Sequence, residues 1–271
     1  MPELPEVETT LRGIEPHIAE QSISKINIYN PNLRWPVNEE LPAILKNQTL
    51  KTLSRRGKYL ILSFKKGHLL LHLGMSGSLR VLNKSEPLQK HDHFEMIFKN
   101  GKALRLRDPR RFGSVLWTNE PWETHPLIAK LGPEPLSDML SDDYLYQNSR
   151  NKTVAIKSYI MNSHIVVGVG NIYASESLFL AGINPNRAAN KVSKPRYLKL
   201  TQAIRFVLSQ AIKQGGTTLK DFNSPDGKPG YFAQQLNVYG RKNEACPQCG
   251  KNITQKMINQ RATYYCTQCQ K

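Results

Sequence analysis

The segment HFEMIFKNGKALRLRD, residues 93–108, decides the fold class of the N-terminal half of the chain. Its two apolar stretches flank Asn100-Gly101, a dipeptide that is a strong short-range signal for a hairpin. In the second stretch leucines alternate with arginines, so Leu104 and Leu106 should lie on one face of a strand and the arginines on the other. The segment therefore predicts two antiparallel strands.

Similar stretches lie on both sides of this hairpin. KYLILSF (58–64) and HLLLHLG (68–74) are separated by the turn KKG, and GSVLWT (113–118) adds a further strand. Residues from about 22 to 118 are therefore predicted to form an antiparallel sandwich or barrel. The segment before residue 20 is expected to be a helix, because Pro5 suits a first helical turn and acidic residues follow it.

The pattern changes to helices in the second half of the chain. Apolar residues recur at helical spacing in TQAIRFVLSQAIKQGG (201–216), and NIYASESLFLAGINP (171–185) predicts a shorter helix that ends near Gly182. The stretch from 215 to 230 is rich in Gly, Pro and Asp, which predicts a loop. The fold class predicted from these patterns is α+β, with more than one domain among the 271 residues.

The composition is strongly basic. Thirty-eight Lys and Arg residues stand against 21 Asp and Glu residues, which gives a formal charge of +17 and predicts a polyanionic partner. A basic enzyme of another kind or a ribosome-associated protein is the alternative that charge alone leaves open. No apolar run approaches the ~20 residues of a membrane span, and no secretory signal opens the chain, so we expect a cytoplasmic protein without a membrane partner.

All four cysteines lie near the C-terminus, in two C-x2-C pairs separated by 16 residues: Cys246, Cys249, Cys266 and Cys269. This spacing predicts one tetrahedral zinc ion on a two-stranded hairpin. Four protein ligands would close the site, so the zinc would be structural. A disulfide framework is disfavoured in the reducing cytosol, and a redox dithiol needs only one pair. Arg261, near the expected hairpin tip, suits a phosphate contact.

The N-terminus, MPELPEVETT, places carboxylates beside proline at the start of a basic chain. Removal of the initiator methionine would leave Pro2 with a free secondary amine, whose pKa near 8 leaves a neutral fraction able to attack an electrophilic carbon. Glu3 and Glu6 are close enough in sequence to move protons for that amine. The alternative is that this segment only starts a helix.

Two other patterns suggest little chemistry. GVGN (168–171) lacks the third glycine of a dinucleotide fingerprint and instead predicts a turn before a helix that begins at Asn171, where backbone amides can hold a phosphate. His91, Asp92 and His93 are interpreted as polar strand residues, because no third metal ligand stands at motif spacing.

Taken together, the chain resembles the bacterial formamidopyrimidine-DNA glycosylase family from end to end. The resemblance is carried by PELPEVET (2–9), SRRGKYL (54–60), HLGMSGSLR (72–80), DPRRFG (108–113), VVGVGNIYASESLF (166–179), GGTTLKDF (215–222), DGKPGYFAQQLNVYGR (226–241) and RATYYCTQCQK (261–271). It implies a bifunctional enzyme that excises oxidised purines, such as 8-oxoguanine opposite cytosine and formamidopyrimidines, and then cuts the DNA strand at the abasic site.

The resemblance also implies catalytic roles. Pro2 would attack the anomeric carbon and form a Schiff base, Glu3 would act as acid and base at the sugar ring oxygen, and Glu6 would support that site. β- and then δ-elimination would follow. Lys58 matches the family's catalytic lysine beside a phosphate, and Lys157 matches a lysine implicated in handling the oxidised base.

The implied DNA contacts fall into two groups. Met75, Arg110 and Phe112 would fill the space left by the extruded nucleotide, with the arginine bonded to the orphaned cytosine. The positions that match backbone phosphate contacts are His72, Asn171, Tyr239 and Arg261. The loop from 217 to 229 matches the segment that closes over the flipped base, and Lys220 is its candidate contact residue.

The implied architecture has four parts. They are a catalytic β-sandwich domain with its N-terminal helix (1–130), a linker (131–150), a helix–two-turn–helix domain with the lesion-capping loop (151–235) and a zinc-ribbon hairpin (236–271). The expected form is a monomer with one structural Zn2+ that binds double-stranded DNA containing oxidised bases or abasic sites.

Three alternatives remain open on the sequence. Endonuclease VIII shares the scaffold and prefers oxidised pyrimidines, although PELP at the N-terminus and the separated Met75 and DPRRFG elements favour the purine enzyme. A non-catalytic, zinc-dependent DNA-binding protein is disfavoured by the combination of Pro2, Glu3, Glu6 and Lys58. An RNA-binding or ribosomal factor is supported by charge alone.

Overall fold

The computed structural model describes residues 2–217 and 235–271 and divides the chain into two compact units. The first unit contains Met1–Lys130 and Gly215–Tyr231, and the second contains Leu131–Gln214 and Phe232–Lys271. Within the described residues, no helix combines the length and the apolar character needed to cross a membrane.

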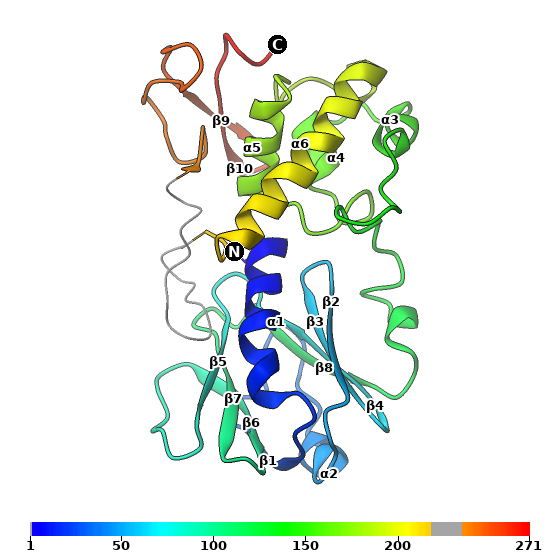
Figure 1. The fold of residues 1–271 in the computed structure, drawn as a ribbon, viewed down its shortest axis with the longest axis vertical. Helices are drawn as coiled ribbons and strands as arrows, with labels where there is room; N and C mark the ends of the chain where they lie inside the picture. Colours follow the sequence, from blue (N-terminus) through cyan, green and yellow to red (C-terminus); the bar gives the residue numbers. More distant parts are fainter. Residues whose placement is uncertain (1, 218–234) are drawn as a thin grey trace. The chain divides into compact units, whose positions relative to one another are not determined.

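The first unit is built on two four-stranded antiparallel sheets (Figure 1). One sheet has the order β1-β6-β7-β5, from β1 (Ile23–Ile28), β5 (Ser78–Asn83), β6 (Asp92–Phe98) and β7 (Lys102–Arg107). The other has the order β2-β3-β4-β8, from β2 (Thr52–Arg56), β3 (Tyr59–Phe64), β4 (Gly67–His72) and β8 (Ser114–Thr118). The helices are α1 (Leu4–Ile18) and α2 (Leu41–Leu45), with the short 3-10 helix η1 (Trp122–Thr124). The predicted sandwich and its N-terminal helix are confirmed.

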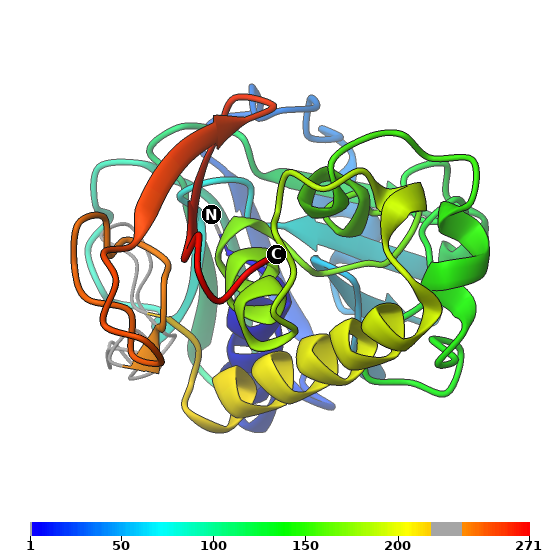
Figure 2. The same ribbon diagram turned by 90° about the horizontal axis from the view of Figure 1, so that it is seen from above.

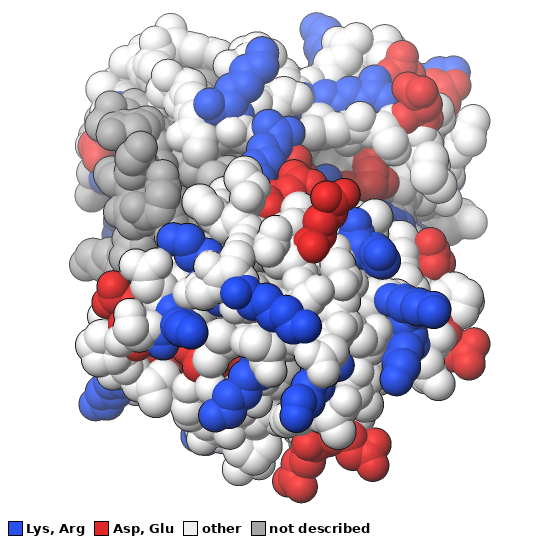
Figure 3. All heavy atoms as spheres, turned by 60° about the horizontal axis from the view of Figure 1, so that its bottom comes forward, with Lys and Arg blue, Asp and Glu red and all other residues white. Residues whose placement is uncertain are grey.

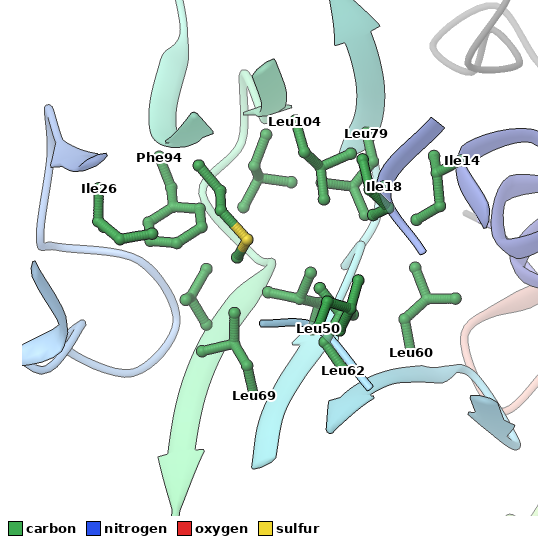
Figure 4. Packing of buried hydrophobic residues seen from close by; sticks show 14 of the residues in the cluster. Ile14, Ile18, Ile26, Leu50, Leu60, Leu62, Leu69, Leu79, Phe94 and Leu104 are labelled. Atoms are coloured by element: carbon green, nitrogen blue, oxygen red, sulfur yellow. The ribbon is translucent and has the colours of Figure 1, made fainter. Parts of the chain in front are cut away.

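The core of this unit lies between the apolar faces of the sheets and α1. Phe94 and Leu104 of one sheet face Leu62 and Leu69 of the other, and all four side chains are buried (Figure 4). Apolar residues of α1 recur every three or four positions and pack on the same core, with Ile14 fully buried. The helix and the two sheets therefore bury one continuous cluster.

The hairpin at Asn100-Gly101 forms as predicted, but its arginine face is not a solvent face. Arg105 on β7 is only 1% exposed, and its guanidinium contacts Glu95 at 2.6 Å and Asp92 at 3.3 Å. Burial alone would raise the pKa of Glu95, but hydrogen bonds from Tyr29 and Arg105 hold it below the ordinary value. The alternating pattern correctly assigns the face and gives no sign that this face carries a buried ion-pair network.

The second unit is mainly helical and ends in a two-stranded hairpin. Its elements are α3 (Tyr144–Ser149), α4 (Ile156–Ile160), α5 (Asn171–Leu180), η2 (Ala189–Lys191), α6 (Lys194–Lys213), β9 (Thr254–Ile258) and β10 (Arg261–Tyr265). Helix α5 lies between α6 and the β9–β10 hairpin (Figure 2). Helix α6 begins before the apolar stretch that predicted it, because Ser193 stands at its N-cap and Pro195 fits its first turn.

Candidate functional site

The first turn of α1 holds the N-terminal carboxylates inside the first unit. Glu3 at the N-cap is 2% exposed and Glu6 is fully buried. The Glu6 carboxylate accepts the backbone N–H of Glu3 through Oε2 at 2.8 Å, in a capping box. Pro2 is also buried. The residues that start the helix are therefore the same as the candidate acid/base pair. The segment can begin α1 and also serve the chemistry proposed for Pro2.

Glu6 also fixes the first residues of the predicted lesion-capping loop. Its Oε1 accepts the backbone N–H of Thr217 at 2.9 Å. The preceding Gly216 has a φ of +79°, and a side chain there would meet Glu6 Oε1 at 3.0 Å. The remainder of the loop from 217 to 229, with Lys220, lies outside the described residues. Glu6 thus joins the first turn of α1 to residues more than two hundred positions later in the chain.

Arg55 connects α1 to the turn that carries Lys58. Its guanidinium donates to Glu8 Oε2 at 2.8 Å and to the carbonyl of Gly57 at 3.0 Å. Gly57 has a φ of +57°, a backbone conformation that glycine favours in the tight turn between β2 and β3. Burial alone would raise the pKa of Glu8, but the Arg55 and Arg12 guanidiniums hold it below the ordinary value. Lys58 is therefore positioned by a charged link to the helix that bears Glu3 and Glu6.

His72, at the end of β4, presents one hydrogen-bond donor. Its Nδ1 accepts the backbone N–H of Gly74 at 2.9 Å, so the ring proton of the neutral imidazole is on Nε2. Burial, followed by the nearby charges of Lys58 and Arg34, lowers the pKa of His72 to about 4. The residue is therefore a neutral N–H donor at physiological pH, as suits a phosphate contact in a cationic region.

Asp108 joins the two loops that carry the predicted space-filling residues. Its carboxylate is fully buried and accepts the Ser76 hydroxyl at 2.8 Å, the Gly113 N–H at 2.7 Å and the Arg110 N–H at 3.3 Å. Ser76 follows Met75 directly. A side chain at Gly74 would meet the Phe112 backbone at 2.4 Å, so glycine permits the close approach of these loops. The structure thus brings Met75 close to the DPRRFG loop.

Arg110 and Phe112 form the exposed end of this loop. The Arg110 guanidinium lies over the Phe112 ring at 4.9 Å from its centroid, and the ring itself is 43% exposed. A large aromatic side chain in that position costs free energy in water and can recover it by stacking with a base. Phe112 is therefore not a core residue.

Lys157 is buried at the junction of α4, α5 and β10 in the second unit. It is 1% exposed, and its ammonium donates to Asn171 Oδ1 at 2.6 Å, Thr263 Oγ1 at 2.8 Å and the carbonyl of Ala262 at 3.2 Å. Three acceptors match the three N–H bonds of an ammonium group. The lysine thus fixes the orientation of the Asn171 amide, whose Nδ2 is left to donate.

Glu176 places Tyr239 beside Asn171. The carboxylate of Glu176, on α5, is 1% exposed and accepts the backbone N–H groups of Asn237, Val238 and Tyr239 at 2.8, 3.0 and 2.9 Å. The Tyr239 hydroxyl then lies 3.4 Å from Asn171 Nδ2. A buried carboxylate saturated by amides is a rigid support, so two of the predicted phosphate contacts are held side by side.

Arg261 follows the tight turn between β9 and β10. Asn259 and Gln260 have φ angles of 44° and 58°, and the register pairs Ile258 with Arg261 across the turn. The Asn259 amide donates to the Ser158 hydroxyl at 2.8 Å, which anchors the turn on α4. The structure therefore brings Arg261 to the same corner of the second unit as Lys157 and Asn171, whereas Lys58, His72 and the space-filling residues belong to the first unit.

The four cysteines form the one cluster of potential metal ligands in the described part of the chain. Their sulfur atoms all lie within 4.8 Å of one another, with Cys249 and Cys266 at 3.5 Å and Cys246 and Cys269 at 3.9 Å. These sulfur–sulfur distances are longer than a disulfide bond. They lie on either side of the ~3.8 Å expected between two sulfur atoms that are each ~2.3 Å from a tetrahedral zinc ion. The cluster fits such a metal. Among the same described residues, His91 and His93 belong to no such cluster.

The charges on one face of the molecule do not mark a single basic patch. On the face drawn in Figure 3, Lys and Arg side chains are scattered over the surface, with Asp and Glu between some of them. The candidate contacts are distinguished by their supports instead. The supporting residues are Arg55, Asp108 and Glu176, which belong to the segments SRRGKYL, DPRRFG and VVGVGNIYASESLF. Nothing in their local sequence pattern identifies their long-range partners.

Two family models match the chain. The formamidopyrimidine-DNA glycosylase N-terminal domain matches residues 1–115, and the formamidopyrimidine-DNA glycosylase H2TH domain matches residues 131–223. Among curated proteins, the formamidopyrimidine-DNA glycosylase of Hydrogenovibrio crunogenus is 56% identical over 271 residues, covering 100% of this chain and 97% of the relative. That of Haemophilus ducreyi is 57% identical over 272 residues, covering 100% and 98%.

Solved structures give the same result. The MutM (Fpg) protein of Thermus thermophilus superposes with a TM-score of 0.90 at 33% identity, over 99% of this chain and 98% of that one. Lactococcus lactis Fpg in complex with a DNA containing Fapy-dG gives a TM-score of 0.92 at 34% identity, over 99% and 100%. A complex of the Lactococcus lactis protein with abasic-site DNA gives 0.92 at 34% identity, over 99% of both chains.

Proposed function

The chain belongs to the formamidopyrimidine-DNA glycosylase family, and from this premise we propose that it excises oxidised purines and cleaves the DNA strand through its N-terminal proline. It is a DNA glycosylase of base excision repair. The proposed substrates are 8-oxoguanine opposite cytosine and formamidopyrimidines in double-stranded DNA, together with abasic sites. The observation that carries the residue assignment is the buried capping box beside Pro2. It stands at the start of α1, the helix whose Glu8 is linked by Arg55 to the Lys58 turn.

The proposed chemistry begins with the secondary amine of Pro2. Its lone pair forms a bond to C1′ of the damaged nucleotide, and the bond from C1′ to the base nitrogen breaks with the electrons leaving on the base. The proton that the Pro2 nitrogen loses neutralises the departing base. Glu3 gives a proton to the ring oxygen, which opens the sugar and leaves an iminium ion at C1′. Glu6 keeps the first turn in place through its bond to the Glu3 N–H.

Strand cleavage then follows from the iminium ion, which acidifies the C2′ hydrogens. Loss of a C2′ proton expels the 3′ phosphate, a second elimination expels the 5′ phosphate, and water releases the sugar fragment from Pro2. The charge of Lys58 stabilises a phosphate beside the reacting sugar. Sodium borohydride reduces the iminium ion, so this pathway has a covalent signature.

The proposed DNA contacts fall into two groups, those that replace the extruded nucleotide and those that bind backbone phosphates. Met75, Arg110 and Phe112 replace the extruded nucleotide, since the exposed ring can stack and the guanidinium can bond the opposite cytosine. His72 in the first unit, and Asn171, Tyr239 and Arg261 in the second, bind backbone phosphates. Lys220 remains a proposed contact of the capping loop.

The four-cysteine cluster would hold one structural zinc ion, whose role is to fold the hairpin and not to react. We also propose the division into segments 1–130, 131–150, 151–235 and 236–271, a monomeric state and a cytoplasmic location. The excess of basic residues suits a nucleic-acid partner.

A trapping experiment tests the function. With duplex DNA that contains 8-oxoguanine opposite cytosine, borohydride is expected to yield a covalent adduct on Pro2, and without borohydride the strand is expected to be cut on both sides of the lesion. A matched duplex with thymine glycol is expected to react more slowly. Gel electrophoresis and peptide mapping of the adduct provide the measurements.

Each alternative has its own outcome in this experiment. Faster cleavage at thymine glycol would assign the chain to the endonuclease VIII type. Binding without an adduct or a cut on either duplex would leave a non-catalytic DNA-binding protein, and preference for RNA over DNA would point to an RNA-binding factor.

Lys157 is proposed to act through Asn171 rather than on the base, and replacement by methionine tests this role. The change removes three hydrogen bonds. It leaves the acceptors on Asn171 and Thr263 without this donor, at about 1–3 kcal/mol each, whereas the Ala262 carbonyl keeps the bond from Asn171 Nδ2. We expect roughly 10-fold or greater weakening of binding to duplexes with 8-oxoguanine and with an abasic analogue alike. Fluorescence anisotropy measures both, and a thermal unfolding curve reports the cost to the fold.

Lys152→Met is the matched control, because Lys152 is exposed and lies just before the same helix. It is expected to bind both duplexes nearly as the parent does. If Lys157→Met instead loses only the 8-oxoguanine reaction and keeps abasic binding, the lysine handles the oxidised base directly.

A further inference from the structure

A pocket of about 200 Å³ lies beside His72 in the first unit. Its lining residues are Arg34, Trp35, Tyr59, His72, Ser114 and Leu127. Three of them are neighbours across adjacent strands, because the register pairs Tyr59 with His72 and His72 with Ser114. Directly paired residues project to the same face of a sheet, so three polar side chains from β3, β4 and β8 meet at one place.

These side chains offer donors that no described residue accepts. His72 uses Nδ1 to accept the Gly74 N–H, which leaves its Nε2–H as a donor. Within residues 2–217 and 235–271, neither this N–H nor the hydroxyls of Tyr59 and Ser114 has a hydrogen-bond partner. Burial raises the pKa of Tyr59, so its hydroxyl keeps its proton and remains a donor.

Arg34 adds a charge to this group. Its backbone N–H donates to the carbonyl of Gly113 at 3.1 Å, which ties its loop to the residue just before β8. Its guanidinium forms no ion pair with the described acidic residues. Both Arg34 and Lys58 repel a proton on His72, so the pocket carries positive potential without a carboxylate to offset it. Such a site attracts an anion.

Trp35 and Leu127 give the same pocket an apolar side. Trp35 is 45% exposed, unusually open for a residue with this much apolar area, and it follows Arg34 directly. A phosphate alone would need no such surface. A phosphate joined to a deoxyribose would use the donors for its oxygens and the indole for its sugar carbons.

We propose that this pocket, the Arg34 pocket, binds one phosphate and its sugar from the DNA backbone, with Arg34, Tyr59 and Ser114 extending the contact made by His72. The assignment rests on the proposed function, because it takes DNA as the partner. Arg34 is a positioning residue in this proposal. It holds the backbone of the DNA strand that is to be cleaved and touches no reacting atom. The ligand chemistry is that of a phosphodiester.

The test is the salt dependence of binding to an uncleavable duplex that carries an abasic analogue. Arg34→Met removes the charge and keeps the apolar stem, and it is expected to weaken binding about 10-fold at low salt, equally for damaged and undamaged duplexes. The slope of log K against log [NaCl] should fall by about 0.9, the value for one phosphate contact. Tyr59→Phe and Ser114→Ala should weaken binding less and leave the slope unchanged.

Lys25→Met is the matched control, since it removes one exposed positive charge from the same unit at a position away from the pocket. It should change the slope far less than Arg34→Met does. Duplexes with a single uncharged methylphosphonate, moved one position at a time, should identify one phosphate at which the parent loses affinity and Arg34→Met does not. Thermal unfolding curves should coincide for the parent and Arg34→Met, because the Arg34 side chain makes no hydrogen bond or ion pair within the described residues.

Equal slopes for the parent and Arg34→Met would overturn the inference even if glycosylase activity is confirmed. A shift of the His72 ring resonances by inorganic phosphate, combined with equal slopes, would also overturn it and assign the pocket to free phosphate. Failure of the parent to bind any duplex would instead refute the proposed function. The two failures are therefore distinguishable.

Discussion

A chain in which one residue is inserted before Pro2 and retained is expected to lose strand cleavage by at least about 10³-fold in single-turnover assays. The insertion converts the proline nitrogen into an amide, which has no basic lone pair for attack on C1′. Binding to the abasic analogue should weaken far less than cleavage, because the phosphate contacts are made by other residues. Borohydride should trap no adduct with this chain.

The preference for an α-amine over a lysine has a quantitative basis. With a reference pKa near 8, about a tenth of the α-amine is neutral at pH 7, against less than about a thousandth of an ordinary lysine. Cleavage by the parent should therefore increase as the pH approaches 8. The measurement is the single-turnover rate from pH 6 to 9 with 8-oxoguanine duplex.

Pro2→Gly is the matched variant, since it keeps an unblocked amine at the same place. It should retain trapping at a reduced rate, whereas the chain with the insertion should not react. Full-rate cleavage by the chain with the insertion would show that another atom attacks the sugar. The roles of Glu3 and Glu6 would then need to be reassigned, although their buried capping box would still explain the start of α1.

The elements that the sequence predicts well are those whose signals are local. Asn100-Gly101 determines its hairpin turn, and Leu104 and Leu106 face the core as their alternation indicates. The spacing of the four cysteines predicts their cluster because each C-x2-C pair is local in sequence, and a two-stranded hairpin is enough to bring the two pairs together. Family motifs supplied the rest of the candidate site.

What could not be predicted depends on partners far apart in the sequence. The alternation of leucine and arginine places Arg105 on the face away from Leu104. Only the fold shows that Arg105 forms ion pairs with Asp92 and Glu95 on that face. A lysine in a motif gives no sign of whether its ammonium contacts a ligand or, like Lys157, three acceptors inside the protein. Arg34 belongs to no chemical motif, and it is the fold, through the bond from its backbone N–H to the Gly113 carbonyl, that brings its loop to the pocket of Tyr59 and His72.

Removal of the metal is expected to have the largest effect on the second unit. The segments that flank the β9–β10 hairpin share a small core with α5, which consists of Phe179, Val238, Cys246, Ile253 and Cys266 with the side chains packed on them. Two strands with so few apolar contacts are marginal in water, whereas structural zinc contributes on the order of 10–16 kcal/mol to small metal-dependent folds. Cys249→Ser should therefore unfold the hairpin.

Unfolding of the hairpin removes Arg261 from its place and frees the carbonyl and hydroxyl that hold Lys157. We expect binding to the abasic analogue to weaken at least 100-fold, both after chelation of the metal and in Cys249→Ser. Elemental analysis should find one Zn2+ per chain in the parent and none in the variant. Gln268→Ser, between two of the cysteines, is the control and should keep both metal and affinity. Because α1 and both four-stranded sheets form a separate core, unfolding of the first unit should remain cooperative at an unchanged temperature. Full affinity in a metal-free chain would mean that the hairpin folds without zinc, and the cysteine cluster would then need another explanation.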